Sequence, residues 1–381
     1  MSTNGTTLGQ RLRTARETAG ISTRAVSTRM QVQGHRVSHT TLCAFETDKI
    51  TPTIEIVSAL AQIYGLDASW FNSNTPLLTG TCYRCLKSVK VSQKQAYQGA
   101  ALGWLRAYIA VENALDRPLT PMKLFRNFHV DPRESGETVA KRIREMLKLD
   151  IYPVPSVVRL AENFGIRVIQ LETESRIDGF AAFLEATPVM VVNPSLSNDR
   201  IRINIAHELA HHLFRDCSTD GKSEENDLME ARVFECGSFL LMPDSQLKAA
   251  FELQSMVRLV QYKERFGLSL AAMIYRAKRK KYLDGTVYEQ LWKDFARLGW
   301  RQREPGYVAP DRPIRMEALF DAAIRSKRMS EREIARVAGV DELVVRARIL
   351  RAMGAVASEP DRLNDNIVYN FQTYKNEFGY Y

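Results

Sequence analysis

The sequence has few cysteines and no long apolar run. Only five of its 381 residues are cysteines, an odd number in a long chain, which argues against a disulfide-stapled scaffold. No apolar stretch reaches the roughly 18 residues that a membrane-spanning helix needs. The first ten residues, MSTNGTTLGQ, also lack the apolar core of a signal peptide. We therefore expect a cytoplasmic protein with no membrane partner.

Charge is distributed unevenly along the chain. The composition is globular, with 45% hydrophobic and 25% charged residues, and the length predicts two or three domains. Acidic side chains outnumber basic ones by 20 to 13 in residues 129–245, whereas basic ones predominate by 8 to 2 in residues 73–128 and by 13 to 6 in residues 246–310. This pattern fits a chain that meets phosphates with some parts and does other chemistry in its centre. Solvated surface charge explains it equally well.

Residues 1–72 contain four segments in which apolar side chains recur at helical spacing. Ser22 and Ser38 stand in N-cap positions before the second and third segments, Thr51-Pro52 starts the fourth, and Gly65 ends it. In the third segment, HTTLCAFETDK, the apolar residues Leu42 and Phe45 face the core. The polar residues at its start therefore face outward. Helix, turn, helix is also how any small bundle is built, and the spacing alone leaves DNA binding undecided.

Particular residues make the helix-turn-helix interpretation specific. The run LGQRLRTARETAGIS … VSHTTLCAFETDKITPTIEIVSALAQIYGL resembles the lambda-repressor/Cro-like (Xre) family, including Glu46 and Pro52. The third helix of that family enters the major groove of an operator in double-stranded DNA, and palindromic operators favour a homodimer. The QVQGHR connection is longer than the usual turn, which leaves the angle of that helix open, and solvent exposure explains His39 as well as a base contact does. The resemblance implies base-edge contacts by Ser38, His39, Thr40 and Thr41 and phosphate contacts by Arg36 and Lys49.

A connecting segment follows. NSNTPLLTG has linker composition, and residues 92–115 predict a long amphipathic helix. Cys82 and Cys85 form a CxxC, but a structural zinc site needs a second pair of ligands and none lies near in the sequence. Thiols that bind no metal are therefore the favoured interpretation.

The chain then changes to a mixture of helices and short strands, and a helix predicted near residues 195–214 carries the sequence HELAH. His207 and His211 are four residues apart, so both imidazoles project from one helical face and can ligate one tetrahedral Zn²⁺. Glu208 lies beside that metal, where its carboxylate can take the proton of a zinc-activated water. A buried pair of hydrogen-bonded histidines is the alternative. His212 faces away from the pair and is interpreted as a surface residue or as a support to the site.

A catalytic zinc needs a third protein ligand. The next predicted helix, EENDLMEARVFECGSFLLMP, offers Glu230 at the margin of its apolar stripe, and we favour it as the third ligand. The rival acidic residues in and before this helix are Glu224, Glu225, Asp227 and Glu235.

These residues also carry a second resemblance. The stretch PSVVRLAENFGIRVIQL … DGFAAFL … PVMVVNPSLSNDRIRINIAHELAHHLF … MEARVFECGSFLLMP is similar to the ImmA/IrrE-type metallopeptidases over about residues 137–305. The resemblance implies a gluzincin-like site, with zinc on His207, His211 and Glu230 and with Glu208 as the general base. It also implies that a transcriptional repressor is cleaved to relieve repression, in phage or mobile-element immunity or in a stress response. Glu235 and Cys236 stand where small residues are common in the family, which affects local packing.

Two further patterns lie toward the C-terminus, one a basic run and the other a pair of helices. The basic run from Arg276 to Lys281 fits a solvated helix end better than a nucleic-acid contact. Residues 329–352 have a helix-turn-helix-like pattern, for which a packing hairpin is favoured over a second DNA reader.

The sequence thus predicts a mainly α multidomain chain. Its parts are an all-α helix-turn-helix bundle in residues 1–72, a linker and long connecting helix in 73–128, an α+β zincin-like peptidase domain with a small sheet in 129–305, and a helical region in 306–381. The leading functional hypothesis is a zinc endopeptidase fused to a DNA-binding domain that cuts a repressor or itself. The alternative is a DNA-binding regulator whose metal site is structural or sensory. An enzyme that acts on nucleic acid is a poorer third, because no carboxylate cluster for two metals is present.

Overall fold

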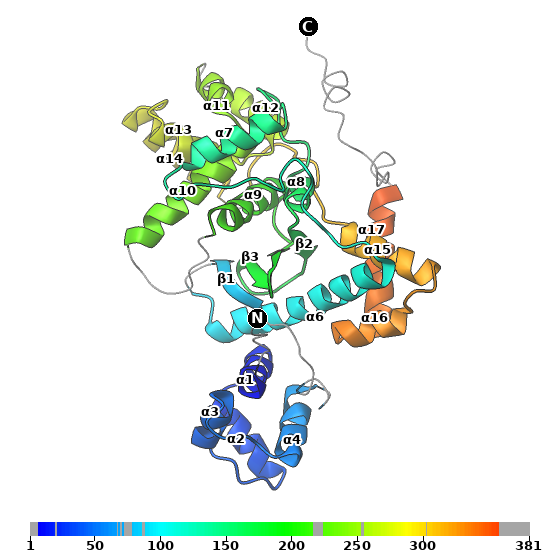
Figure 1. Ribbon diagram of the computed structural model, residues 1–381. Coiled ribbons are helices and arrows are strands. Elements are labelled where there is room, and N and C mark those ends of the chain that lie inside the picture. Colours follow the sequence, from blue (N-terminus) through cyan, green and yellow to red (C-terminus); the bar gives the residue numbers. More distant parts are fainter. Residues whose placement is uncertain are drawn as a thin grey trace.

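The computed structural model describes residues 7–19, 21–66, 68, 71, 78–85, 88–215, 224–252, 255–301 and 303–357. Helices predominate among them, and one four-stranded sheet lies near the centre of the molecule (Figure 1). The predicted mainly α multidomain fold is therefore confirmed. No helix in the described part of the chain is long and apolar enough to cross a membrane.

The N-terminal bundle has its own core. Each of its four helices contributes an almost completely buried side chain to this core: Leu12, Met30, Leu42 and Leu60. The last helix begins two residues later than expected, because Thr53 acts as its N-cap and accepts a hydrogen bond from the Ile56 amide. The helices are α1 (Leu8–Thr18), α2 (Thr23–Val32), α3 (His39–Glu46) and α4 (Ile54–Tyr64).

A buried ion pair joins the first and third helices of the bundle. Arg16 in α1 donates two hydrogen bonds to the Glu46 carboxylate in α3, one of them from Nη2 to Oε2 at 2.8 Å. Glu46 is only 8% exposed, so this bidentate pair fixes α3 against α1 in a place where neither charge is well solvated.

The sheet has the order β1-β3-β4-β2. β3 pairs antiparallel with both of its neighbours, whereas β2 and β4 are parallel. Its strands are β1 (Leu78–Cys85), β2 (Arg167–Gln170), β3 (Ile177–Leu184) and β4 (Thr187–Val192).

The edge strand β1 corrects an expectation, because the sequence predicts that residues 78–85 belong to a linker. LTGTCYRC has no clean apolar alternation, and two irregularities in register interrupt its pairing with β3. The segment becomes a strand because it pairs with the edge of β3. That partner lies about 100 residues away in the sequence, so local sequence does not reveal it.

The two faces of the sheet are covered by different helices. In β4, Met190 and Val192 face one core, while Val189 and Val191 face the other, as strand alternation requires. The first core is shared with α7 (Gly136–Met146), α8 (Val157–Asn163), α9 (Asn198–Phe214), α10 (Glu224–Leu241), α11 (Asp244–Phe251), α12 (Met256–Phe266), α13 (Leu270–Arg279) and α14 (Gly285–Arg297). The second is shared with α6 (Val91–Leu115), α15 (Arg315–Arg325), α16 (Glu331–Ala338) and α17 (Glu342–Ala357) (Figure 1).

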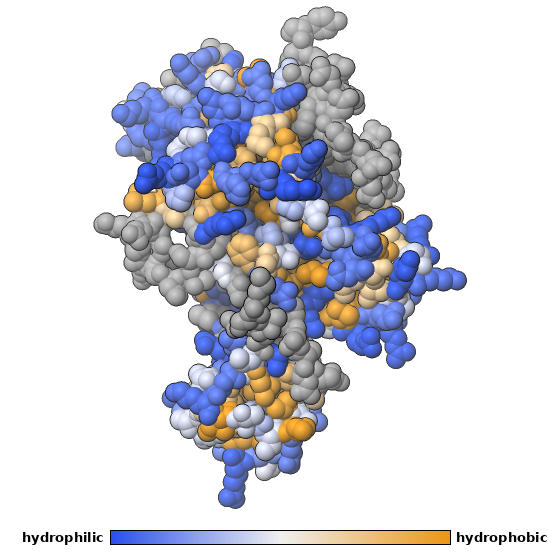
Figure 2. All heavy atoms as spheres, in the orientation of Figure 1, coloured by the Kyte–Doolittle hydropathy of each residue, from blue (hydrophilic) through white to orange (hydrophobic). Residues whose placement is uncertain are grey.

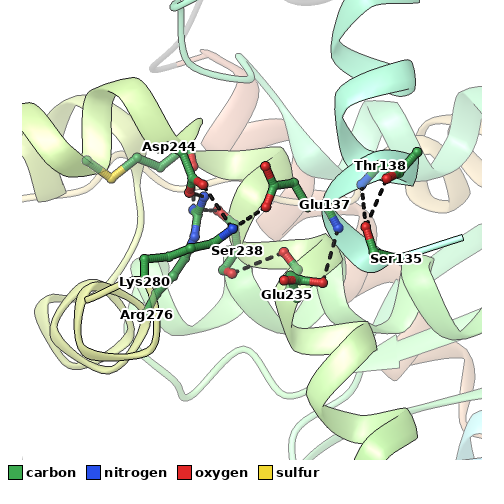
Figure 3. Close-up of polar contacts among 9 residues, drawn as sticks. Ser135, Glu137, Thr138, Glu235, Ser238, Asp244, Arg276 and Lys280 are labelled. Carbon is green, nitrogen blue, oxygen red and sulfur yellow. Dashed lines mark hydrogen bonds and ion pairs between the residues drawn. The ribbon is translucent and has the colours of Figure 1, made fainter. Parts of the chain in front are cut away.

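The basic run at the end of α13 is not a solvated helix end throughout. Arg276 is 3% exposed and donates hydrogen bonds to the carbonyls of Ser238 and Met242 and to the carboxylate of Asp244. Lys280 forms ion pairs with Asp244 and with Glu137 in α7 (Figure 3). Arg276 thus binds carbonyls at the C-terminal end of α10, where positive charge is favourable, and Lys280 ties α13 to α7 through Glu137.

The C-terminal helix-turn-helix-like pattern forms a hairpin that packs on the rest of the molecule. Gly103 of α6 lies so close to the Ala338 carbonyl of α16 that a Cβ there would be 2.2 Å from the oxygen. The arginines of α17 pair with acidic residues, Arg346 with Glu331 and Arg348 with Glu317. The arrangement is the packing hairpin that the sequence favoured.

Candidate metal centre and DNA-reading helix

The helix that carries HELAH is buried on nearly all sides. α9 lies against the sheet and α8 on one side and against α10 on another, and every residue from Ile201 to His212 is buried. His207 and His211 are 6% and 4% exposed. Because the surrounding elements fix the helix, the orientations of both imidazoles are set by packing.

The structure brings His207, His211 and Glu230 together. The two Nε2 atoms are 3.1 Å apart, His207 Nε2 lies 3.2 Å from Glu230 Oε2, and His211 Nε2 lies 3.5 Å from Glu230 Oε1. Tetrahedral zinc with bonds of about 2.0–2.1 Å separates its ligand atoms by about 3.3–3.4 Å. The three donors therefore fit one such ion, and the 60% exposure of the Glu230 side chain leaves the centre open to solvent on that side.

This trio is the only group of three or more potential metal ligands in the described part of the chain. Of the rivals to Glu230, Glu235 is engaged elsewhere and accepts a hydrogen bond from the Glu137 amide at the start of α7 (Figure 3). The side chains of Glu224, Glu225 and Asp227 lie outside the described residues. Cys82 and Cys85 belong to strand β1 and to no such group.

The ionisation of the trio suits a divalent metal. Burial lowers the pKa of His207 to about 4, so its imidazole is neutral at pH 7. Hydrogen bonds from His207 and His211 hold the pKa of Glu230 well below its usual range, so its carboxylate is ionised. A neutral imidazole and a carboxylate are the forms that bind a metal ion.

The neighbours of the two histidines have separate roles. Glu208 is 2% exposed and follows His207 in the helix. His212 is not a surface residue, because it is buried and its Nε2 lies 3.0 Å from the Val189 carbonyl of β4. Its ring also packs edge-on against Phe183, so it holds α9 on the sheet.

Close helix packing behind the site depends on a glycine that no motif marked. A Cβ on Gly237 of α10 would be 3.0 Å from the backbone of Ala206 and of His207, tighter than ordinary contacts. The signal in the sequence is a glycine in the interior of a predicted helix, where it is otherwise unfavourable. Its absent side chain lets α10 approach α9 and bring Glu230 to the histidines.

The predicted DNA-reading residues lie around the start of α3. Arg36, Ser38, His39, Thr40 and Lys49 are exposed, and Thr41 is half-buried. Ser38 caps the helix, since its Oγ accepts a hydrogen bond from the Thr41 amide at 3.1 Å. That hydroxyl also lies 2.7 Å from Thr40 Oγ1, so part of its bonding capacity is used within the protein. The base and phosphate contacts stay predictions.

Replacing Lys49 by Ala tests the phosphate contact. We expect weaker operator binding that is uniform across DNA sequences, with the slope of log affinity against log salt reduced by about one. Electrophoretic mobility shifts at several salt concentrations measure both. Lys293→Ala, a change of an exposed lysine in α14, is the matched control and is expected to leave the slope unchanged. An unchanged slope for Lys49→Ala contradicts the contact.

Comparison with known families identifies two parts of the chain. Residues 161–278 match the IrrE N-terminal-like domain of the M78 peptidases, and residues 7–69 match a helix-turn-helix domain. Curated proteins and solved structures yielded no match. The first match contains α9 and α10, which carry the whole metal centre, and the second contains α1 to α4. The chain thus joins an N-terminal helix-turn-helix domain to a peptidase domain of the ImmA/IrrE type.

Proposed function

We propose that this protein is a zinc-dependent, gluzincin-like endopeptidase of the cytoplasm that binds an operator and cleaves a transcriptional repressor, or itself, to control gene expression. The observation that carries the proposal is the convergence of His207, His211 and Glu230 at tetrahedral spacing, with Glu208 next to His207 on the same helix. Mobile-element immunity and stress response are the settings that its resemblance implies.

Each residue of the centre has a defined task. His207, His211 and Glu230 would hold Zn²⁺, which polarises the peptide carbonyl and lowers the pKa of water to about 7. Glu208 takes a proton from the attacking water and later gives it to the departing amine nitrogen. Because α9 is buried against the sheet, Glu208 is held in place before substrate arrives.

The helix-turn-helix domain would place this activity on DNA. α3 would enter the major groove of an operator, and a palindromic operator would be read by a homodimer. Apolar side chains are exposed on the bundle: Val32 and Ile54 are 85% and 86% exposed, and Figure 2 shows apolar residues on this part of the surface.

The number of ligands in the described part of the chain supports a catalytic metal rather than a structural one. Structural zinc sites are closed by four protein ligands, whereas the described residues supply three here. A regulator with a structural or sensory metal is therefore the less favoured alternative.

Metal removal tests the proposed function. Purified protein should contain one zinc per chain and should cleave the repressor encoded beside its gene. We expect a chelator to abolish cleavage and added zinc to restore it, because the described residues offer one centre. Cleavage is followed by mass spectrometry of the products, with metal content measured on the same samples. Full cleavage by protein that has lost its metal would contradict the proposal.

A further inference from the structure

The last helix of the C-terminal hairpin is apolar on two opposite faces. α17 lies at an outer edge of the molecule, against α15 and α16 (Figure 1). Val345 and Ile349 on its inner face are 0% and 7% exposed, whereas Leu343 and Leu350 on its outer face are 68% and 65% exposed. A helix that is apolar on both faces is normally covered on both. The outer face of α17 therefore has the composition of an interface.

The outer face forms one continuous stripe. Residues 343, 347, 350 and 354 follow one another at intervals of four, three and four, so they lie in one row along the helix. The two leucines alternate in this row with small exposed residues, Ala347 and Gly354. No atom of the described structure lies within 4 Å of the position that a Cβ would take on Gly354. We call these four residues the α17 stripe.

The stripe lies where a helix-turn-helix hairpin would read DNA. The second helix of such a motif contacts base edges with residues near its start. Here those residues include Asp341 and Glu342, whose negative charge repels phosphates. Leu343 and Ala347 have no side-chain group that could form a hydrogen bond with a base edge. The chemistry of this surface suits a protein partner and not DNA.

The sizes of the side chains along the stripe match a second copy of the same stripe. When two α17 helices pack antiparallel about a two-fold axis, Leu343 meets Gly354 and Leu350 meets Ala347 across the contact. Every leucine then lies over a small residue, so the two backbones can approach closely without leaving voids. Parallel packing would instead set leucine against leucine and leave the small residues facing each other.

The charges beside the stripe are also self-complementary. The two-fold axis brings each flank of the stripe against the same flank of the other copy, so a flank with charges of one sign would repel itself. Arg346 and Arg351 project on opposite sides of the stripe. Arg346 pairs with Glu331 of α16 at 2.6 Å, and Arg351 pairs with Glu172 at 3.3 Å. Each flank thus presents both signs of charge to its copy, which favours a second copy over a partner of one charge sign.

We propose that the α17 stripe is the surface through which two copies of this chain form a two-fold symmetric homodimer, with the two α17 helices antiparallel. Only one helix of each copy takes part, so we expect a small interface and a dissociation constant on the order of 10 μM. Dimerisation itself does not depend on peptidase activity or on DNA. The use of this dimer to read a palindromic operator rests on the proposed function.

Sedimentation velocity on the full chain without DNA tests the dimer. Wild type should change from monomer to dimer between about 1 and 100 μM. Leu350→Lys puts one charge from each copy into the contact and should weaken dimerisation at least about thirtyfold. Val257→Lys is the matched control, because Val257 is 69% exposed on α12, and it should leave the dimer unchanged. Both positions are exposed, so thermal unfolding of the monomers should stay close to that of wild type.

A further variant tests how the two helices pack. Gly354→Leu places a side chain in open space and replaces glycine by a better helix former, so the monomer should unfold at no lower temperature than wild type. In the antiparallel dimer, however, the new side chain would meet Leu343 of the partner subunit and hold the helices apart. We expect dimerisation to weaken at least about tenfold, although the variant is more apolar.

The outcomes separate this inference from the proposed function. Wild type that stays monomeric at about 100 μM overturns the inference and leaves the stripe to another protein. A dimer that Leu350→Lys leaves intact also overturns it and assigns dimerisation to another surface. An unchanged or tighter dimer of Gly354→Leu overturns the antiparallel pairing. Wild type that dimerises as expected yet binds no operator and cleaves no repressor defeats the proposed function instead.

Discussion

Replacing Glu208 by Gln is expected to lower repressor cleavage by about 10²–10⁴-fold, the range that general acid–base groups contribute. The amide cannot accept the proton of the attacking water, although it has nearly the size and shape of the carboxyl group. His207, His211 and Glu230 are untouched, so we expect zinc content to stay at one per chain. Rates of product formation and metal analysis on the same preparation measure the two effects separately.

The control for this prediction is Glu289→Gln, the same change at an exposed position of α14 far from the centre in the sequence. It should leave both cleavage and zinc unchanged. The same pair of variants decides between the two functional hypotheses. A regulator with a structural or sensory metal has no need of a base, and its activity in cells would survive Glu208→Gln. Unchanged repressor cleavage would equally contradict the role of Glu208.

Parts of the site that depend on local geometry could be predicted from the sequence. Spacing within one helix placed His207 and His211 on a common face, because a helical turn brings residues four apart together. Glu230 could also be predicted as a ligand. The sequence predicts the helix that carries it, and a short connection favours antiparallel packing of that helix against the one before it. In the structure, the ligand atoms of His207, His211 and Glu230 lie 3.1–3.5 Å from one another.

Features that depend on distant partners could not be predicted in this way. Strand β1 exists because β3 offers an edge to pair with, and its own sequence does not alternate. Arg276 looked like part of a charged surface, yet it is buried because Ser238, Met242 and Asp244 supply acceptors from another helix end.

The largest expected loss of stability concerns a buried ion pair next to the metal helix. Asp311 is 5% exposed, precedes α15, and accepts a hydrogen bond from Arg202 of α9 at 2.8 Å. Its carboxylate also accepts hydrogen bonds from Ser156 Oγ and the Val157 amide, both at 2.6 Å, at the start of α8. One side chain thus joins α8, α9 and the segment that leads to the C-terminal helices.

Asp311→Asn removes the charge and keeps the size. Arg202, 6% exposed, would then be a buried cation with no ionised partner in the described structure, so we expect the free energy of unfolding to fall by about 3–5 kcal/mol. Urea unfolding of the metal-free protein measures this loss. Asp321→Asn is the matched control, because Asp321 pairs with Arg325 at the same 2.8 Å, yet Arg325 is 73% exposed. Its loss should not exceed about 1 kcal/mol. Equal losses would contradict the prediction. The larger loss at Asp311 is expected because Arg202 is left buried without an ionised partner and because the amide cannot accept all of the hydrogen bonds that the carboxylate accepts from Arg202, Ser156 and Val157.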